Sequence, residues 1–537
     1  MEMFTVLLFS SNTVYLMVAF LMVALVMILT EFQLKVNPNS DLKAIGRKII
    51  YGQWWSVFSL FVSYDGQVQG KEVKVIRKAP GPKRFPIIGS LKELDGYEVP
   101  YEAFNVLGKK YGPVVSLKMG SYEAIVVNGI EHIKEVLINK AQSFDSRPNF
   151  NRYNRLFAGN KENSLAFCNW SEMQRVRREM LIPHSFPRNF SDRFTQLNHY
   201  VMNEIQQVLG EAPLNPTIEI KPLLVSISAN VFLQYFASFR FEYDDAQFQS
   251  FMKKFDLIFY EVNQGYAADF LPFLMPLHQR NLKRMNHMAE DIRNTLLKNI
   301  INDRCEKWAP GNAENDYLDC LINYVNSTNS PKMEWETALF AFEDIIGGHC
   351  AVANFLTKTF GYIIQNEEVQ QKIQAEVERT LERTGKHCVE LSDRGQMPYT
   401  DAVIMESLRL ISSPIVPHVA SQDSEIGGYN VPKDALIFLN NYELSMSEDL
   451  WEAPKRFIPE RFIQNGRVVK PDFFLPFGAG RRSCMGYKMT QLLSFSIISN
   501  LLHSYSLAPI EGHSYQVPVG SLAMPEKAYT FQITRRH

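Results

Sequence analysis

Apolar positions recur at the spacing of an α-helix along most of this chain. The periodicity predicts long helices at 170–181, 190–210, 245–265, 280–305, 334–364, 366–384, 398–411 and 489–502. Shorter apolar stretches predict strands at 114–117, 124–127 and 435–439, and residues 145–168 have the composition of a loop. Because helices dominate and the strands are short, we expect a mainly α fold with small β-sheets.

The chain begins with an apolar run. Residues 6–29 carry no charged side chain, and this run is long enough to span a bilayer as a helix. A cleaved signal peptide is the alternative, but its basic start and small-residue cleavage site are missing. The positive charges at 35, 43, 47 and 48 follow the run and none precedes it, which places the body of the protein in the cytosol. We therefore predict a membrane anchor at 1–30.

A proline-rich segment separates the N-terminal region from the body. Prolines at 80, 82 and 86 fix φ and remove N–H donors, which predicts a stiff, non-helical hinge. Residues 31–79 before it mix charged and aromatic positions, and we interpret them as a linker or a membrane-surface segment. The remaining residues, 80–537, are numerous enough to bury a large core.

Charge and cysteine content narrow the classes of function. Positive and negative side chains nearly balance, at a net charge of −1, so nothing indicates a nucleic acid partner. The six cysteines lack paired spacing, which predicts neither a disulfide framework nor a zinc site and fits a reducing compartment.

One cysteine stands in a glycine-rich loop before the helix predicted at 489–502. Residues 477–486 read Phe-Gly-Ala-Gly-Arg-Arg-Ser-Cys-Met-Gly. Glycine lets a backbone turn tightly and approach a flat or bulky group. A thiol at a helix N-terminus, beside Arg481 and Arg482, should have a lowered pKa, and thiolate is a strong ligand for iron. A buried structural cysteine is the alternative interpretation of Cys484.

The pattern Phe-x-x-Gly-x-Arg-x-Cys-x-Gly is complete in Phe477, Gly480, Arg482, Cys484 and Gly486, and it resembles the haem-binding signature of the cytochrome P450 family. The resemblance covers the chain from residue 80 onward and implies a haem-thiolate catalytic domain over 80–537 with that family's fold. It implies haem b as cofactor and Cys484 as axial ligand of its iron. It also implies electrons from NADPH through a separate NADPH-cytochrome P450 reductase. The implied location is the endoplasmic reticulum membrane, single-pass, with the catalytic domain cytosolic.

The resemblance assigns further residues to the haem. Arg482 and His418 match positions where relatives hold the haem propionates; for His418 a satisfied loop histidine is the alternative. Trp170 matches the start of the family's Trp-x-x-x-Arg segment, but the fourth residue after it is Gln174 and Arg175 comes one later. One helical residue rotates a side chain by about 100°, which displaces Arg175 from the family position.

A second motif lies in the helix predicted at 398–411. Glu406 and Arg409 share one face of an otherwise apolar helix, so the pair should point inward, where buried charges need partners. A surface ion pair is the commoner meaning of this spacing. By resemblance, Arg461 joins the pair, and the three residues form a structural network that braces the Cys484 loop.

The helix at 334–364 departs from the family pattern. Gly347, Gly348 and His349 align with the distal Ala/Gly-Gly-x-Asp/Glu-Thr motif, whose glycines leave room for oxygen. Two adjacent glycines cost about 2 kcal/mol relative to alanine, which requires a reason. Cys350 and Ala351 stand at the acid and threonine positions, and alanine cannot donate a proton. The proton source must lie elsewhere, and we favour His349 or a substrate hydroxyl over water and Asn354.

Segments 147–153, 159–165 and 347–354 resemble the spook and spookier type of arthropod cytochrome P450. Those enzymes belong to ecdysteroid biosynthesis, so the resemblance implies a sterol substrate and an early step from 7-dehydrocholesterol towards the ketodiol. Two alternatives stay open: an isomerase or dehydratase on the same haem scaffold, and a haem-binding sterol carrier or sensor without turnover.

The family layout also predicts surfaces. The sterol cavity should be lined by 150–167, 267–276, the glycine helix, 412–419 and 519–525. The apolar segment 267–276 is either buried core or a loop dipping into the membrane beside the substrate entrance. Four cations are candidates for reductase docking, with an ordinary solvated face as the alternative: Arg175, Arg178, Arg481 and Lys488.

Overall fold

The computed structural model describes residues 77–97, 99–210 and 217–536. These lie in one compact unit, Arg77–His537. The anchor predicted at 1–30 and most of the linker predicted at 31–79 lie outside the described residues.

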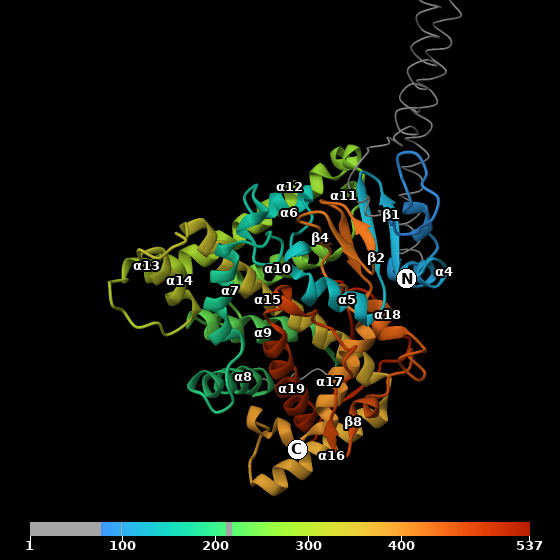
Figure 1. The fold of residues 1–537 in the computed structure, drawn as a ribbon. Coiled ribbons are helices and arrows are strands. Elements are labelled where there is room, and N and C mark those ends of the chain that lie inside the picture. The colour runs from blue at the N-terminus through green and yellow to red at the C-terminus, as the bar shows by residue number, and fades with distance from the viewer. Residues whose placement is uncertain (1–76, 98, 211–216, 537) are drawn as a thin grey trace, which may run out of the picture. The chain divides into compact units, whose positions relative to one another are not determined.

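Helices form most of the described chain (Figure 1). They are α4 Pro100–Tyr111, α5 Ile130–Lys134, α6 Asn151–Leu156, α7 Glu172–Ser185, α8 Asp192–Gly210, α9 Ile220–Ala237, α10 Ala246–Asn263, α11 Ala267–Phe270, α12 Met275–Leu296, α13 Asn302–Glu306, α14 Tyr317–Val325, α15 Trp335–Ile364, α16 Glu367–Thr384, α17 Pro398–Ile411, α18 Asn441–Met446 and α19 Tyr487–Ser504. The mainly α expectation from the apolar periodicity is confirmed for this part of the chain.

Small sheets flank the helices. The four-stranded sheet has the order β1-β2-β7-β4, with β1 Val114–Met119, β2 Tyr122–Val127, β7 Leu436–Leu439 and β4 His418–Val419. β2 and β7 are parallel, with Ala124 opposite Leu436, so segments more than three hundred residues apart share one sheet. A three-stranded sheet has the order β10-β11-β3, with β10 Tyr505–Ala508, β11 Thr530–Arg535 and β3 Thr217–Glu219. Two hairpins complete the strands: β5 Ser424–Ile426 with β6 Tyr429–Val431, and β8 Ile463–Gln464 with β9 Arg467–Val468.

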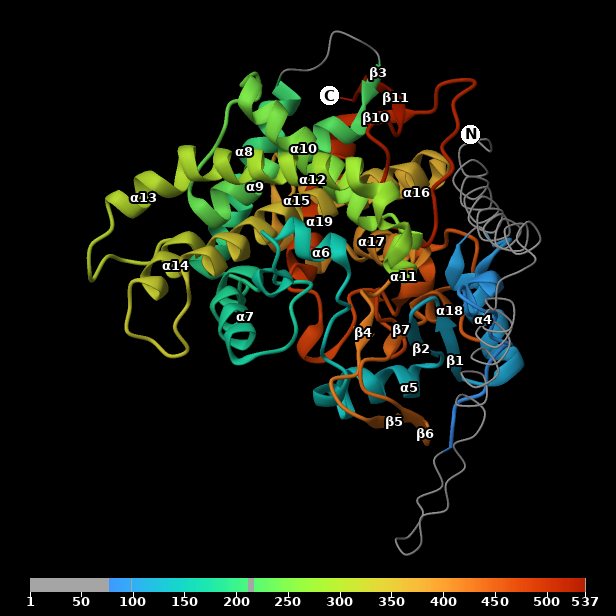
Figure 2. The ribbon, with the colours of Figure 1, turned by 90° about the horizontal axis from the view of Figure 1, so that it is seen from above.

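Helix α15 occupies the centre of the helical region and packs along α9 (Figures 1 and 2). Both are apolar and long enough, by composition, to cross a membrane, yet most of each is buried inside the fold, as expected of core helices. The sequence patterns did not predict α9, because it is apolar on nearly every side and therefore lacks helical periodicity.

The apolar segment 267–276 is partly buried and partly exposed. Ala268, Leu271 and Met275 are buried, while Phe273 is 55% exposed and Leu277, just after the segment, is 60% exposed. The segment comprises α11, a 3-10 turn and the first residues of α12, rather than an irregular loop. One face therefore packs into the fold and the other presents apolar side chains outward.

Candidate active site

The Cys484 loop is folded tightly before the first turn of α19. The Cys484 N–H donates to the Phe477 carbonyl at 3.0 Å, which closes the loop on itself. Gly480 has a φ of +67°, and a Cβ there would lie 2.0 Å from the Leu137 carbonyl oxygen. Glycine at 480 is thus required for close approach to the segment that follows α5.

A cavity of about 410 Å³ lies between this loop and α15. The loop lines it with Phe477, Arg482, Cys484 and Gly486 among others, so four of the five motif residues reach the same space. Further walls come from α15, from residues just before β4 and from the C-terminal turn, and they include Ile345, Ile415, Val416 and Leu522. The cavity thus lies between the Cys484 loop and the glycine motif of α15.

Cys484 lines this cavity and is an exposed residue. Burial raises its pKa above the usual value, and this effect exceeds the opposing effects of the Gly486 N–H and the Arg178 charge. The expectation that the pKa of the Cys484 thiol is lowered is therefore wrong. One reason is that Arg481 turns away: it pairs with Asp145 at 3.0 Å and lies over the Trp170 ring.

Three guanidinium groups converge on the cavity: Arg147, Arg178 and Arg482. They donate to backbone carbonyls, with Arg482 bound to Cys168 O at 2.6 Å and Arg178 to Ser483 O at 2.8 Å. Among the ion pairs of the described residues, none involves any of the three. Burial and repulsion by Arg482 lower the pKa of Arg147 well below its ordinary value and that of Arg178 to about 10. Such uncompensated positive charge marks a site for an anion.

His418 adds an unpaired buried atom to the same cavity. Its Nδ1 lies 2.5 Å from the Phe144 carbonyl, which can only accept, so Nδ1 carries the proton. Its Nε2 is buried without a partner. Burial, followed by the Arg147 charge, lowers the pKa of the imidazole well below its usual value. A carboxylate bound beside Nε2 would offset these effects and favour a proton there.

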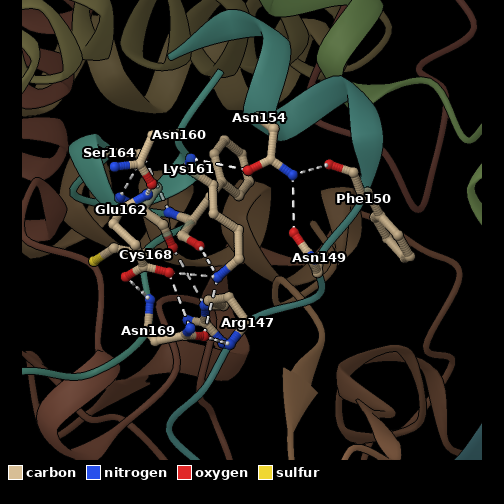
Figure 3. A network of polar contacts seen from close by, with 12 residues as sticks. Arg147, Asn149, Phe150, Asn154, Asn160, Lys161, Glu162, Ser164, Cys168 and Asn169 are labelled. Atoms are coloured by element: carbon tan, nitrogen blue, oxygen red, sulfur yellow. Dashed lines mark hydrogen bonds and ion pairs between the residues drawn. The ribbon is translucent and has the colours of Figure 1, made fainter. Parts of the chain in front are cut away.

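A polar network holds the loop that begins at Arg147 (Figure 3). Lys161, only 5% exposed, donates to Glu162 at 2.9 Å and to Asn169 at 3.0 Å. Asn169 donates to Glu162 and accepts from the Arg147 backbone N–H at 3.1 Å. The Arg147 guanidinium is fixed by the carbonyls of Ala166 and Val416, at 3.2 Å each. The cation is therefore preorganised within the cavity wall.

Neither Trp170 nor Arg175 lines the cavity. Arg175 is 46% exposed and paired with Glu172 and Glu179 on its own helix, so its expected propionate role is not supported. The one-residue displacement explains this, because the inward position belongs to Gln174, which donates to Leu165 O at 2.8 Å. Arg178, one turn later, is the cation of α7 that enters the cavity, and we had predicted it only as a docking residue.

The structure brings Glu406, Arg409 and Arg461 together. Glu406 and Arg409 are fully buried and joined by two hydrogen bonds of 2.8 Å. Arg461 Nε lies 3.1 Å from Glu406 Oε1, which also accepts from the Ile458 N–H at 2.9 Å. Trp451 stacks under both guanidiniums. One carboxylate thus ties α17 to the segment 456–461.

From Gly348 to Phe355, the residues of α15 that line the cavity are apolar. Gly348, Ala351 and Val352 line the cavity, whereas Gly347, His349 and Cys350 do not. The His349 ring is buried, with Nδ1 at 2.6 Å from Ile346 O and its face against Phe255. This placement gives no support to the prediction that His349 serves the oxygen side, since the residue after Gly348 is rotated by about 100° around the helix.

The glycine pair also leaves room for side chains of neighbouring helices. A Cβ on Gly347 would lie 3.0 Å from the Phe255 ring of α10, and one on Gly348 would lie 3.0 Å from the Phe232 ring of α9. Both glycines therefore admit aromatic rings of neighbouring helices close to α15. Only Gly348 also borders the cavity.

Sequence reasoning missed Asp344, which lines the cavity from α15. Its Oδ2 accepts from the Leu165 N–H at 2.6 Å and from the Ser164 hydroxyl at 2.9 Å, joining the 147–169 loop to the helix. Burial raises its pKa to about 6. Asp344 lies four residues, about one helical turn, before Gly348, and this spacing was the available signal.

The predicted lining is partly right. Leu165, Ala166, residues 413–416 and Leu522 line the cavity, but no residue of 267–276 does. Each of the four cations predicted to dock a reductase interacts within the protein. Arg178 lines the cavity, Arg175 and Arg481 form ion pairs, and Lys488 donates to the Pro187 carbonyl.

The cavity's donors fit a haem. A thiol faces the space from one side, and cations with an unpaired imidazole atom, suited to two carboxylates, border it.

A cytochrome P450 family model matches residues 79–533. Cytochrome P450 307a1 of Drosophila melanogaster is 36% identical over 86% of this chain and 89% of its own length. A steroid 17-alpha-hydroxylase/17,20 lyase of Rana dybowskii is 30% identical over 80% of this chain and 84% of its own length. Cytochrome P450 1A5 of Gallus gallus is 28% identical over 86% of this chain and 90% of its own length. With the matched family model spanning nearly the whole described unit, the chain belongs to the cytochrome P450 family.

Proposed function

We propose that this cytochrome P450 monooxygenase oxidises a sterol in an early step of ecdysteroid biosynthesis, from 7-dehydrocholesterol towards the ketodiol. The observation that carries the proposal is the apolar distal half of the cavity, formed by Val352, Phe355, Ile415 and Leu522 among others. An apolar cavity with few polar groups suits a largely hydrocarbon ligand. The spook-type segments and a steroid hydroxylase among the relatives support the sterol class.

The proximal residues would hold the cofactor. Cys484 would hold the haem iron through its sulfur, and Arg147, Arg178, Arg482 and His418 would bind the propionates through charge-assisted hydrogen bonds. When bound, haem supplies the iron chemistry that activates dioxygen. The Glu406 network keeps the loop of Cys484 in register.

The distal residues would bind the substrate and exclude water. Gly348, Ala351 and Val352 present no hydroxyl to the cavity, so α15 supplies no relay at the family's usual place. The Asp344 carboxylate is occupied by the loop it anchors. We infer that a substrate hydroxyl, or water held beside it, delivers the proton.

Electrons would come from NADPH through a separate reductase, with the protein in the endoplasmic reticulum membrane. The outward apolar side chains Phe273 and Leu277 support contact with a lipid surface. The microsomal location expected from the family resemblance is consistent with that contact.

The test is reconstitution of the full chain with reductase, NADPH, dioxygen and 7-dehydrocholesterol, followed by mass analysis. We expect a product that depends on NADPH and dioxygen. Because the distal face lacks a hydroxyl, an isomerase or dehydratase is the second candidate, and product formed without NADPH would favour it. Binding of the sterol without any product would favour a carrier. No binding and no product would reject the sterol class.

A further inference from the structure

The C-terminal turn between Tyr515 and Pro525 places one residue, Leu522, in the cavity. The turn packs against α15, where Gly361 leaves room for the Val517 and Tyr529 side chains. It has no regular secondary structure over these residues, so its carbonyls need donors from elsewhere.

Lys358 of α15 supplies two of those donors. The side chain is fully buried, and its Nζ donates to Pro518 O at 2.6 Å and to Ser521 O at 2.5 Å. Within the described ranges, Lys358 takes part in no ion pair. Burial lowers its pKa to about 7, which reflects the cost of keeping an ammonium in this place.

The other side of Leu522 is held as well. Lys221 of α9 donates to Met524 O at 2.7 Å and to Pro525 O at 3.1 Å, and it pairs with Asp256 of α10 at 2.6 Å. Asn354 of α15 accepts from the Met524 N–H at 2.8 Å and donates to Asp256. Backbone groups before and after Leu522 are thus bound by side chains of two core helices, α15 and α9, and Asp256 of α10 binds two of those side chains.

If the side chain at this position only had to fill space in the core, methionine or leucine would stabilise the fold more, because burying an ammonium without an ion-pair partner costs free energy. Lys358 is long enough to satisfy two carbonyls at once, and those carbonyls flank Gly520, whose φ is +73°. The cost of the buried lysine is offset only if this particular turn conformation is required.

We propose that Lys358, with Lys221 at the other end, is a positioning residue that fixes the Pro518–Pro525 turn and so sets the wall that Leu522 presents to bulky ligands. Lys358 touches no ligand itself, since it does not line the cavity. The proposal concerns the cavity of the family's active site and does not depend on the sterol assignment.

The test uses the haem-loaded full chain, Lys358→Met, and Lys332→Met as control, since Lys332 is exposed and precedes α15. Imidazole is small, whereas clotrimazole, a triaryl-substituted imidazole, is bulky; azoles bind haem iron, and this binding is followed by absorbance. We expect K358M to weaken clotrimazole binding by about tenfold or more and imidazole binding by less than about twofold. Hydrogen exchange of the 520–524 amides should accelerate in K358M and not in K332M.

An equal loss of affinity for imidazole and clotrimazole, with unchanged hydrogen exchange at 520–524, would overturn the proposal, because it indicates general damage to the protein. Unchanged clotrimazole affinity would overturn it as well. If K358M does not retain haem, Lys358→Gln is judged by the same two criteria, since glutamine keeps N–H donors at shorter reach. Leu522→Ala should reproduce the selective loss of clotrimazole binding, and adding K358M to it should cause little further loss.

Discussion

The Glu406 network offers the sharpest structural prediction. Glu406→Gln keeps the size of the side chain but removes the charge that Arg409 and Arg461 share. In the native protein Glu406 accepts four hydrogen bonds: two from Arg409, one from Arg461 and one from the Ile458 N–H. After substitution, one of the two acceptor oxygens becomes an NH2 donor, and the charge of the fully buried Arg409 is met only by neutral acceptors, which include the carbonyls of Ser445 and Arg456.

The expected loss is large because the network lies in the core. Removing one partner of a buried pair costs about 3–5 kcal/mol, since a buried charge is left uncompensated. A typical domain has about 5–15 kcal/mol in total, so a substantial part of the stability would be lost. The segment 456–461 is tied to α17 through this carboxylate, and we expect its release to disturb the nearby Cys484 loop and lower haem content.

Glu460→Gln is the matched control, because Glu460 neighbours Arg461 in sequence but forms an exposed pair with Lys372, with side chains 47% and 43% exposed. An exposed pair contributes about 0–1 kcal/mol. The assays are thermal unfolding and haem content per polypeptide, determined for both variants in parallel. Full haem content and an unchanged melting temperature in E406Q would refute the reasoning.

Three further predictions concern the cavity and its neighbours. Arg147→Met should speed the transfer of haem to apomyoglobin by about tenfold or more, because a hydrogen bond to a charged group contributes about 1.5–3 kcal/mol. His349→Gln should leave the ratio of NADPH consumed to product formed unchanged, since His349 does not line the cavity. The pKa of Lys358 is about 7 in the folded protein against 10.5 in the unfolded chain. The unfolded state therefore binds more protons between these values, and the wild type should gain about 2–3 kcal/mol relative to K358M between about pH 6 and about pH 9, measured by unfolding.

Each of these has a clear contrary result. Haem transfer at the wild-type rate in R147M would remove Arg147 from the propionate site, and Arg147→Lys, which keeps the charge, should fall between the two. A raised NADPH-to-product ratio in H349Q would return His349 to proton delivery. Parallel stability curves for wild type and K358M would show that the buried lysine does not titrate in this range.

Sequence reasoning succeeded where the signal is local. The Cys484 loop is a contiguous motif whose glycine, cysteine and arginine positions are fixed by a single turn, so its geometry could be anticipated. The inward orientation of Glu406 and Arg409 followed from the apolar residues around them on α17.

The failures have physical causes. Arg147 approaches Arg482 only through the fold, across more than three hundred residues, and nothing in its local sequence marks it as a cation of the cavity. His349 and Arg175 were misplaced because one residue of rotation on a helix, about 100°, changes which side chain faces the cavity. The Cys484 pKa was misjudged because burial raises it, and because Arg481 pairs with Asp145, a partner that the sequence does not reveal.

The central claim is that Cys484 holds haem iron in this cavity. The direct measurement is the absorbance spectrum of the reduced, carbon monoxide-bound full chain, with Cys484→Ser compared with wild type. We predict that wild type shows the red-shifted Soret band characteristic of thiolate ligation and that C484S lacks it. The same band in C484S, or its absence from wild-type protein that contains haem, would contradict the assignment.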